Sequence, residues 1–299
     1  MDTTKQDHLI ERAAALLRQP VTPVTETKLA PPSPGRNPSA LPLRQQSPKA
    51  EGVRKEPEVS KPRLEHNLLA QAGLFEAGGS YSRPAEEFRI IQKKLLQSLS
   101  QTQTGPHVRA NLVMITSALK GEGKSFVSIN LAAEAARHGD RQVLLVDADP
   151  KPLGLRQKLG LTSAPGLLDL ARSVPADAAR FVMPTNADHL NVLPLGTDPK
   201  GGIELLTSKR MAEAIENLSR RYPEWLIFFD APPCLASSIP HTLAGLMGHV
   251  ILVVAANSTQ QDDVEAALDL VQACPQVSLL LNKIPAWSTH SFGAYDYVN

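Results

Sequence analysis

Apolar and polar residues fall into blocks with two different periods from about residue 83 onward. Short runs such as VLLV (143–146), LIFF (226–229) and VILVV (250–254) are apolar throughout. Longer stretches between them repeat apolar residues at helical spacing. Strands that are apolar on both sides belong to sheets covered on both faces. The alternation of strand and helix therefore predicts an α/β fold with a doubly wound, mostly parallel sheet.

The same periods predict where the individual elements lie. Strands are expected at 111–116, 142–146, 190–193, 225–229, 249–254 and 277–281. Helices are expected at 86–99, 124–137, 166–172, 203–221, 239–246 and 261–273. Ligands of such sheets bind beyond the carboxyl ends of the strands. The loops that follow the strands are therefore the places to look for functional residues.

The N-terminal part of the chain has a different composition. Residues 1–74 contain no aromatic side chain, and ten of the 25 prolines lie between Pro20 and Pro62. Such a segment buries too little apolar surface to offset its ordering entropy. We predict a short amphipathic helix at 1–19, either frayed or a docking peptide, and a disordered linker at 20–79. The folded domain is expected at 80–287, followed by a flexible tail at 288–299.

Charge and cysteine content narrow the class of protein. The formal net charge of +1 implies no general attraction to nucleic acid or anionic lipid. Two cysteines, Cys234 and Cys274, make neither a disulfide framework nor a metal cluster and favour a reducing cytoplasm. No apolar run is long enough to span a bilayer, and the N-terminus lacks the pattern of a secretory signal. We therefore expect a cytoplasmic protein.

A phosphate-binding loop follows the first predicted strand. Residues 118–125, ALKGEGKS, match the Walker A pattern with Ala118 in place of its first glycine. Gly121 and Gly123 allow backbone N–H groups to close around phosphate oxygens, and the following helix points its positive end at the same anion. The predicted nucleotide-binding residues are Leu119, Lys120, Gly121, Glu122, Gly123, Lys124, Ser125 and Phe126, with Asn282 expected near the base.

Three carboxylates follow two of the buried strands. Asp147 and Asp149 end VLLVDADPK (143–151), and Asp230 stands in LIFFDAPP (226–233). An aspartate at the end of an apolar strand is costly unless it is paired, hydrogen-bonded or near a cation. One such aspartate could be a helix cap, but three beside a phosphate loop indicate a Mg²⁺-nucleotide site, with the Ser125 hydroxyl as a further ligand.

Together the loop and the two carboxylate motifs resemble the bacterial tyrosine kinases, which are P-loop NTPases of the MinD/ParA-like fold. The resemblance covers about residues 80–285. Within that family the chain is most similar to the tyrosine autokinases of exopolysaccharide and exosortase loci, through LIERAAALLRQP (9–20), the proline-rich linker and LLNKIPAW (280–287). Lys151 departs from the family pattern, which has arginine at that position.

The resemblance implies an ATP-dependent protein-tyrosine autokinase that uses Mg²⁺. Lys124, Asp147, Asp149 and Asp230 would be its catalytic residues, and Ser125, Asp149 and Asp230 its metal ligands. Asp230 would organise the metal shell, Asp149 would support the metal through water, and Asp147 would lie nearest the tyrosine and accept its proton. Charge neutralisation and positioning supply most of the catalysis in such a reaction.

The resemblance also implies acceptor tyrosines and a subunit interface. Tyr295 and Tyr297 in the tail would be phosphorylated in trans, although a chance pair of tyrosines is the alternative. Glu86 and Arg89 match part of the family's E-x-x-R-x-x-R helix, whereas Gln92 replaces its second arginine and cannot make a charged bidentate contact. A simple solvated helix is therefore the alternative to a homo-oligomer interface.

The implied partners are a membrane-bound polysaccharide chain-length determinant protein as activator and a cognate tyrosine phosphatase, with no nucleic acid. The activator would hold the chain at the inner membrane. Two other functions compete with the kinase: an ATP-switched adaptor of the partitioning-ATPase type, and a scaffold without hydrolysis. The signature lysine of the partitioning ATPases falls five residues before Lys124, where this chain has Leu119, and this argues against the adaptor.

Overall fold

The computed structural model describes residues 69, 83–101, 109–138, 140–151, 154–161, 163–173, 177–198 and 201–284. The chain divides into two units, Met1–Pro57 and Glu58–Asn299, and all described residues belong to the second. The predicted N-terminal helix, almost all of the predicted linker and the predicted tail lie outside the described residues. Among the helices that the structure describes, none is long and apolar enough to cross a membrane.

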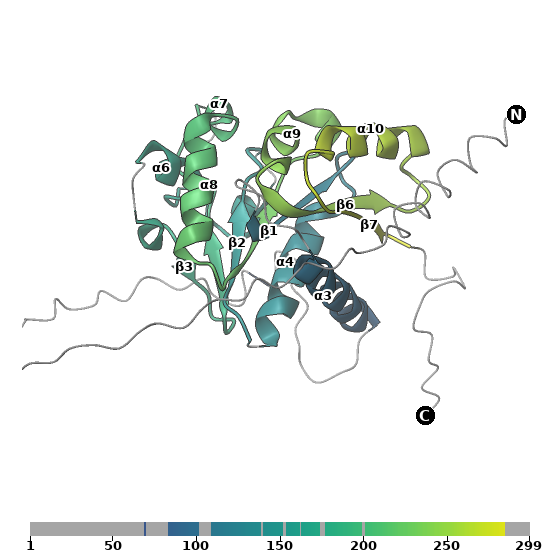
Figure 1. The fold of residues 1–299 in the computed structure, drawn as a ribbon, viewed down its shortest axis with the longest axis horizontal. Coiled ribbons are helices and arrows are strands. Elements are labelled where there is room, and N and C mark those ends of the chain that lie inside the picture. Colours follow the sequence, from purple (N-terminus) through teal and green to yellow (C-terminus); the bar gives the residue numbers. More distant parts are fainter. Residues whose placement is uncertain are drawn as a thin grey trace, which may run out of the picture. The chain divides into compact units, whose positions relative to one another are not determined.

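A seven-stranded sheet forms the centre of the folded unit (Figure 1). Its strands lie in the order β3-β4-β2-β5-β1-β6-β7. They are β1 (Arg109–Ser117), β2 (Val143–Asp147), β3 (Met183–Pro184), β4 (Leu190–Leu193), β5 (Leu226–Asp230), β6 (Met247–Ala255) and β7 (Val277–Asn282). Every pairing is parallel except that of β3 with β4. The predicted fold class and all six predicted strands are confirmed.

Helices cover both faces of this sheet (Figure 1). One face carries α3 (Arg83–Gln101), α4 (Lys124–Arg137) and α5 (Leu155–Lys158). The other carries α6 (Leu167–Arg172), α7 (Ile203–Leu206), α8 (Lys209–Arg221), α9 (Ile239–Ala244) and α10 (Gln261–Val271). Two short 3₁₀ helices, η1 (Ala178–Arg180) and η2 (Cys234–Ala236), complete the elements.

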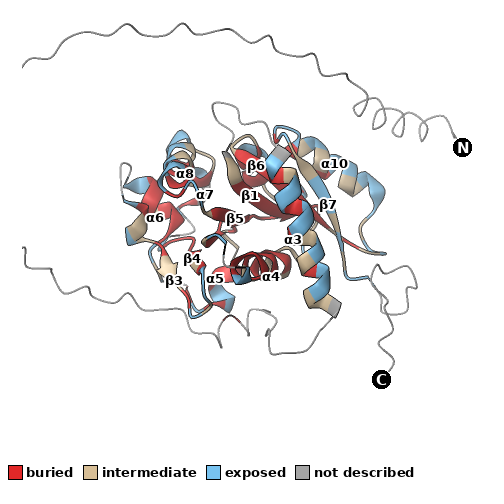
Figure 2. Cartoon of the chain, turned by 60° about the horizontal axis from the view of Figure 1, so that its bottom comes forward, coloured by how far each residue is buried: buried red, intermediate tan, exposed pale blue. Residues whose placement is uncertain are grey.

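Successive side chains of each strand point to opposite faces of the sheet and pack into two separate apolar cores. In β1, Leu112 and Met114 pack beneath α8 to α10, whereas Val113 and Ile115 pack beneath α3 and α4. This alternation explains why the strands are apolar throughout. Leu69, inside the predicted linker, is fully buried in the second core. Figure 2 shows that α4 is largely buried, because it lies between the sheet and α3.

The structure corrects the predicted helix at 203–221, which is two helices. Thr207 ends α7, and the Ser208 hydroxyl accepts a hydrogen bond from the Met211 N–H at 3.3 Å, which caps the start of α8. A capping serine begins a new helix because its side chain replaces a missing backbone partner. The two-residue β3 and the four-residue α5 were not predicted, because such short segments show no period.

Strand register brings the motif residues to one edge of the sheet. Asp230 of β5 lies opposite Asp147 of β2 on one side and opposite Ile115 of β1 on the other. The loop after β1 therefore lies beside both carboxylate strands, at the carboxyl ends where ligands bind in open α/β sheets.

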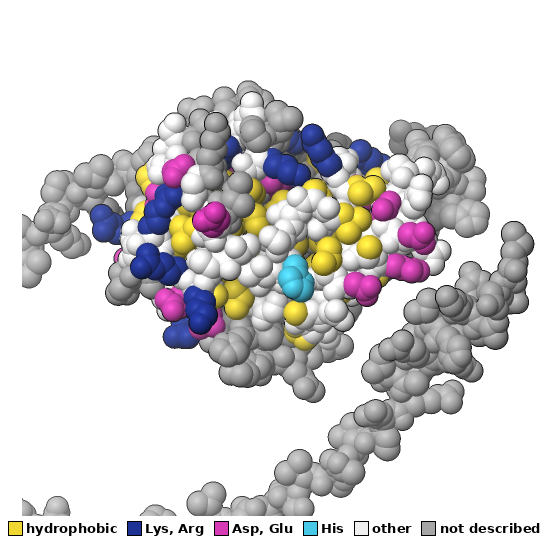
Figure 3. Space-filling view, turned by 90° about the horizontal axis from the view of Figure 1, so that it is seen from above, with side chains coloured by type: hydrophobic (Ala, Val, Ile, Leu, Met, Phe, Trp, Pro, Cys, Tyr) yellow, Lys and Arg dark blue, Asp and Glu magenta, His cyan; other side chains and the backbone are white. Residues whose placement is uncertain are grey.

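Charge is unevenly distributed on the described surface. The solvent-facing side of α10 carries Asp262, Glu265 and Asp269, and Figure 3 shows acidic side chains gathered on that side of the molecule. The near-zero formal charge of the whole chain thus conceals a local acidic region.

Candidate active site

The loop between β1 and α4 is shaped by two glycines with positive φ. Gly121 has φ 90° and Gly123 has φ 100°. A Cβ atom at Gly123 would also lie 2.1 Å from the Asn282 Nδ2 atom. L-residues rarely adopt these angles. Both glycines are therefore required for the loop to turn and expose its backbone N–H groups.

The end of β7 holds this loop from one side. The Asn282 amide donates to the Glu122 carbonyl at 2.8 Å, and the Lys283 ammonium donates to the Gly121 carbonyl at 2.6 Å. The structure thus places the predicted base-contact residue Asn282 against the loop itself. Ala118, in place of the first glycine of the motif, is fully buried, and its carbonyl accepts from the Leu235 N–H at 3.2 Å.

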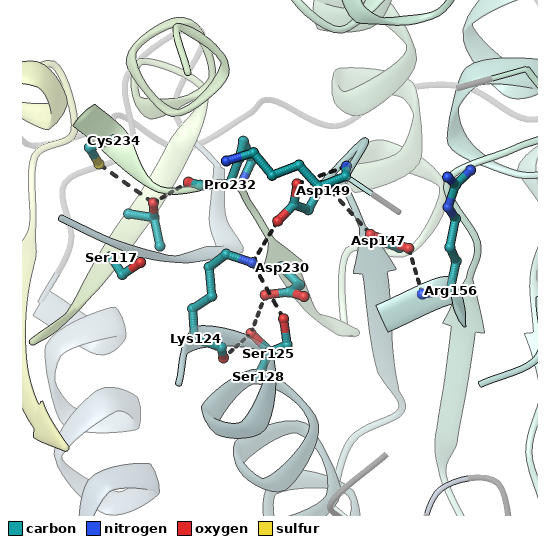
Figure 4. Close-up of polar contacts among 12 residues, drawn as sticks. Ser117, Lys124, Ser125, Ser128, Asp147, Asp149, Arg156, Asp230, Pro232 and Cys234 are labelled. Atoms are coloured by element: carbon teal, nitrogen blue, oxygen red, sulfur yellow. Dashed lines mark hydrogen bonds and ion pairs between the residues drawn. The ribbon is translucent and has the colours of Figure 1, made fainter. Parts of the chain in front are cut away.

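Lys124 and Asp149 form an ion pair in the centre of the site (Figure 4). The Lys124 Nζ atom lies 2.6 Å from Asp149 Oδ2 and 3.4 Å from Ser125 Oγ. Burial lowers the pKa of Lys124, but the Asp230, Asp149 and Asp147 carboxylates raise it by more, so the pKa lies above its ordinary value. Lys124 is therefore a permanent cation in the loop.

Asp230 is fully buried beneath the same lysine. Its Oδ1 atom accepts from the Ser128 hydroxyl at 3.1 Å, and Ser125 lies beside it (Figure 4). Burial raises the pKa of Asp230, although Lys124 opposes the shift. Its Oδ2 atom has no hydrogen-bond partner.

An unpartnered carboxylate oxygen beside a serine hydroxyl fits a hard cation such as Mg²⁺. Mg²⁺ commonly binds one or two carboxylates together with substrate phosphates, rather than a cage made entirely of protein. No cluster of three or more His, Cys, Asp or Glu side chains among the described residues is suited to hold a metal on its own. Asp230, Asp149 and Ser125 lie where such a shared site would form.

Asp147 is a buried acid whose pKa is strongly raised. It is buried, and its oxygens accept from the Asp149 N–H at 3.1 Å and the Arg156 N–H at 2.9 Å. Burial and the neighbouring Asp230 carboxylate raise the pKa of Asp147 to about 7, while the two N–H groups act in the opposite direction. A carboxylate with this pKa is suited to accept a proton near neutral pH.

A cationic cavity of about 280 Å³ opens beside the loop. Four lysines lie in its wall, and Asp149 is the acidic residue there. The lining residues are Lys120, Gly121, Gly123, Lys124, Ser125, Phe126, Asp149, Lys151, Gly154, Lys158 and Pro233. Of the predicted nucleotide-binding residues, Leu119, Glu122 and Asn282 do not line this cavity.

Sequence reasoning missed Lys151, Gly154, Lys158 and Pro233 as site residues, although Lys151 was noted as a departure from the family motif. Lys158 belongs to α5, a helix too short to be recognised from the sequence. Lys151 and Lys158 lie 27 to 38 residues after the two loop lysines, so this cluster carried no local signal in the sequence. The wall's charge nevertheless indicates a polyanionic ligand such as a triphosphate.

The predicted interface residues make contacts within their own chain. Arg89 forms ion pairs with Glu86 on α3 and with the buried Glu134 on α4, the latter at 3.6 Å. Gln92 is only 5% exposed and faces the interior. The predicted acceptors Tyr295 and Tyr297 lie outside the described residues.

Comparison with known proteins identifies the family. No family model matches the chain. EpsB of Ralstonia nicotianae is 41% identical over 146 residues, which are 48% of this chain and 18% of that protein. The tyrosine-protein kinase YwqD of Bacillus subtilis is 33% identical over 162 residues, which are 54% of this chain and 67% of that protein. The chain belongs to the bacterial tyrosine kinases.

A solved structure of a bacterial tyrosine kinase domain agrees. The VpsO kinase domain matches with a TM-score of 0.56 and 31% identity, over 68% of this chain and 95% of that domain. This chain covers less than a fifth of the EpsB protein. The similarity therefore covers nearly all of a solved kinase domain but only a small part of EpsB.

Proposed function

We propose that this chain is an ATP-dependent protein-tyrosine kinase that phosphorylates Tyr295 and Tyr297 of its own kind in trans. The observation that carries the proposal is the Lys124–Asp149 pair at the mouth of a cationic cavity, beside buried Asp230 and Asp147. Kinship with bacterial tyrosine kinases supports tyrosine as the acceptor.

The residues of the site have separate roles in this transfer. Lys124, with Lys120, Lys151 and Lys158 in the cavity wall, neutralises the phosphate oxygens of ATP. The acceptor phenol forms a bond to the γ-phosphorus while the bond from that phosphorus to the ADP oxygen breaks. Asp147 takes the phenol proton, which its pKa near 7 permits.

Mg²⁺, held by Asp230, Ser125 and Asp149, would supply further positive charge where the transferred group develops negative charge. Asp230 is prepared for this role because its Oδ2 atom is buried and without a hydrogen-bond partner. Asp149 presents Oδ2 to Lys124, while its Oδ1 atom accepts from the Lys151 N–H at 3.1 Å.

The proposed setting is exopolysaccharide production. The chain would lie in the cytoplasm, assemble into a homo-oligomer and be activated by a membrane-bound polysaccharide chain-length determinant protein. A tyrosine phosphatase would reverse the modification. The second candidate, an ATP-switched adaptor of the partitioning-ATPase type, uses the same phosphate loop but requires no acceptor tyrosine.

Mass spectrometry after incubation with Mg-ATP tests the proposal, with Lys124→Ala as the matched control. We expect phosphate on Tyr295 or Tyr297 of the unaltered chain and none on the variant, because the variant lacks the loop cation. Release of free phosphate without modified protein, again dependent on Lys124, would instead support the adaptor.

A further inference from the structure

Glu122 lies in the phosphate loop but does not line the cavity. It is 3% exposed, and no ion pair among the described residues involves it. A buried carboxylate without a cation is costly unless several hydrogen bonds compensate for its lost hydration. Its hydrogen-bond partners therefore show what it does.

Three donors from two separate segments converge on the Glu122 carboxylate. Oε2 accepts from the Leu119 N–H at the start of the loop. Oε1 accepts from the Ala255 N–H at 3.1 Å and from the Thr259 hydroxyl. Ala255 ends β6, and Thr259 closes the turn before α10. One side chain thus connects the loop to a turn more than 130 residues away in sequence.

The backbone around Glu122 is joined to the same region. Its carbonyl accepts from Asn282 at the end of β7, and the Asn282 carbonyl accepts from the Ala256 N–H at 2.8 Å. The loop, the β6–α10 turn and the end of β7 therefore form one hydrogen-bonded unit with the Glu122 carboxylate at its centre.

We propose that Glu122 is a positioning residue, which fixes the phosphate loop in its nucleotide-receptive shape by tying Leu119 to the β6–α10 turn. It acts on the nucleotide only through the loop, since it does not line the cavity and its carboxylate oxygens are bound by Leu119, Ala255 and Thr259. The inference rests on the proposed function only in that the loop binds nucleotide phosphates.

Glutamine cannot replace this side chain. All of the groups that face the carboxylate are donors in this arrangement, and a carboxylate is an acceptor at both oxygens. An amide has one oxygen, so its NH₂ group would oppose either the Leu119 N–H or the Ala255 N–H. Leaving such a buried donor unsatisfied is costly. Glu122→Gln should therefore lose the hydrogen bond to either the Leu119 N–H or the Ala255 N–H.

The test is Mg-ADP binding by calorimetry, together with amide hydrogen exchange in the nucleotide-free chain. For Glu122→Gln we expect affinity at least about tenfold weaker, with faster exchange at both Leu119 and Ala255. Thr259→Val should weaken Mg-ADP binding. Thr259→Ser should bind Mg-ADP as the unaltered chain does, because serine keeps the hydroxyl that donates to Glu122. Glu265→Gln, on the exposed face of α10, makes the same chemical change and should bind as the unaltered chain does.

Unchanged affinity and unchanged exchange in Glu122→Gln would overturn the inference and leave the kinase proposal intact. If Glu122→Gln does not fold, the two Thr259 variants provide the test. Equal Mg-ADP affinity of Thr259→Val and Thr259→Ser would also overturn the inference. Failure of the unaltered chain to bind Mg-ADP would overturn the proposed function, and with it the nucleotide-positioning role.

Discussion

At the scale of the residue, the site is defined by three carboxylates around one ammonium group. Asp147, Asp149 and Asp230 are nearly inaccessible to solvent, and Lys124 forms an ion pair with Asp149 while the other two carboxylates act on its charge. The carboxylates differ in role because their neighbours differ: Asp149 contacts the lysine, Asp230 accepts from the Ser128 hydroxyl and Asp147 accepts from backbone N–H groups. The three carboxylates are therefore not interchangeable, although their charges act on one another.

Asp147→Asn should lower the rate constant for phosphoryl transfer by roughly a hundredfold or more, because a general base contributes about 10²- to 10⁴-fold. The unaltered chain should gain rate as pH rises through about 7, where Asp147 loses its proton. The variant should lack this rise. Single-turnover rates between pH 5.5 and 8.5 provide the measurement, and a variant with the same pH profile as the unaltered chain would remove Asp147 from the role of base.

The same group predicts how stability depends on pH. The pKa of Asp147 is about 7 in the folded state and near 3.8 in its unperturbed state. A raised folded-state pKa stabilises the protein fully below the unfolded value, and this contribution is lost as pH rises toward 7. Urea unfolding should show a decline of a few kcal/mol between pH 4 and 7 that is smaller in Asp147→Asn. Equal declines in both chains would contradict the prediction.

At the scale of the element, α3 and α4 are joined by a buried charge. Glu134 of α4 has a side-chain exposure of 2% and pairs with Arg89, with Arg137 at 3.1 Å and with His138 at 3.4 Å. Arg89 is the connection that comes from α3. The helix that was predicted to form a subunit interface therefore also has a role in packing within the chain.

Arg89→Ala should lower the free energy of unfolding by about 1 kcal/mol, because it leaves a buried carboxylate with fewer partners. The estimate is small because Arg89 is itself 43% exposed and its charge is screened by solvent. Glu86→Ala, which removes only an exposed partner of Arg89, should change stability little. Thermal melting and light scattering on both variants separate packing from assembly. A loss of oligomer in Arg89→Ala at unchanged melting temperature would show that its role lies wholly between subunits.

Long periodic elements were predictable from the sequence, and short or composite ones were not. The strand at 250–254 needs only its own apolar residues to be recognised. The break between α7 and α8 depends on the single capping side chain of Ser208. The four-residue α5 follows the loop after β2 and is too short to show a helical period. Within the site, Lys124 and Asp230 were predicted because motifs carry them. Lys158 and the role of Glu122 depend on contacts across more than 30 residues of sequence, which no local pattern records.

At the scale of the whole molecule, the choice of acceptor lies among the four tyrosines of the sequence. Tyr222 is the only tyrosine among the described residues. It is 8% exposed, and its ring stacks on Trp225 with centroids 4.2 Å apart. A phenol held in this way is a poor acceptor for transfer in another active site.

Tyr222→Phe should therefore leave autophosphorylation unchanged, whereas a chain with both Tyr295→Phe and Tyr297→Phe should lose most of its phosphate. Mixing the unaltered chain with Lys124→Ala should place phosphate on the inactive partner, because transfer in trans needs only one intact loop. Phosphopeptide mapping measures the phosphate on the tyrosine variants and on the inactive partner. An unmodified inactive partner would contradict transfer in trans.

The contact between Lys283 and the Gly121 carbonyl has a consequence for kinetics. It holds the end of the folded domain beside the phosphate loop, and Tyr295 follows Lys283 by only 12 residues. Such a segment spans at most about 40 Å when fully extended. If the chain assembles and phosphorylates its tail in trans as proposed, each tail would be tethered near a neighbouring cavity at a local concentration of about millimolar order. Autophosphorylation within an intact assembly would then be a first-order process, with a rate that does not depend on the bulk concentration.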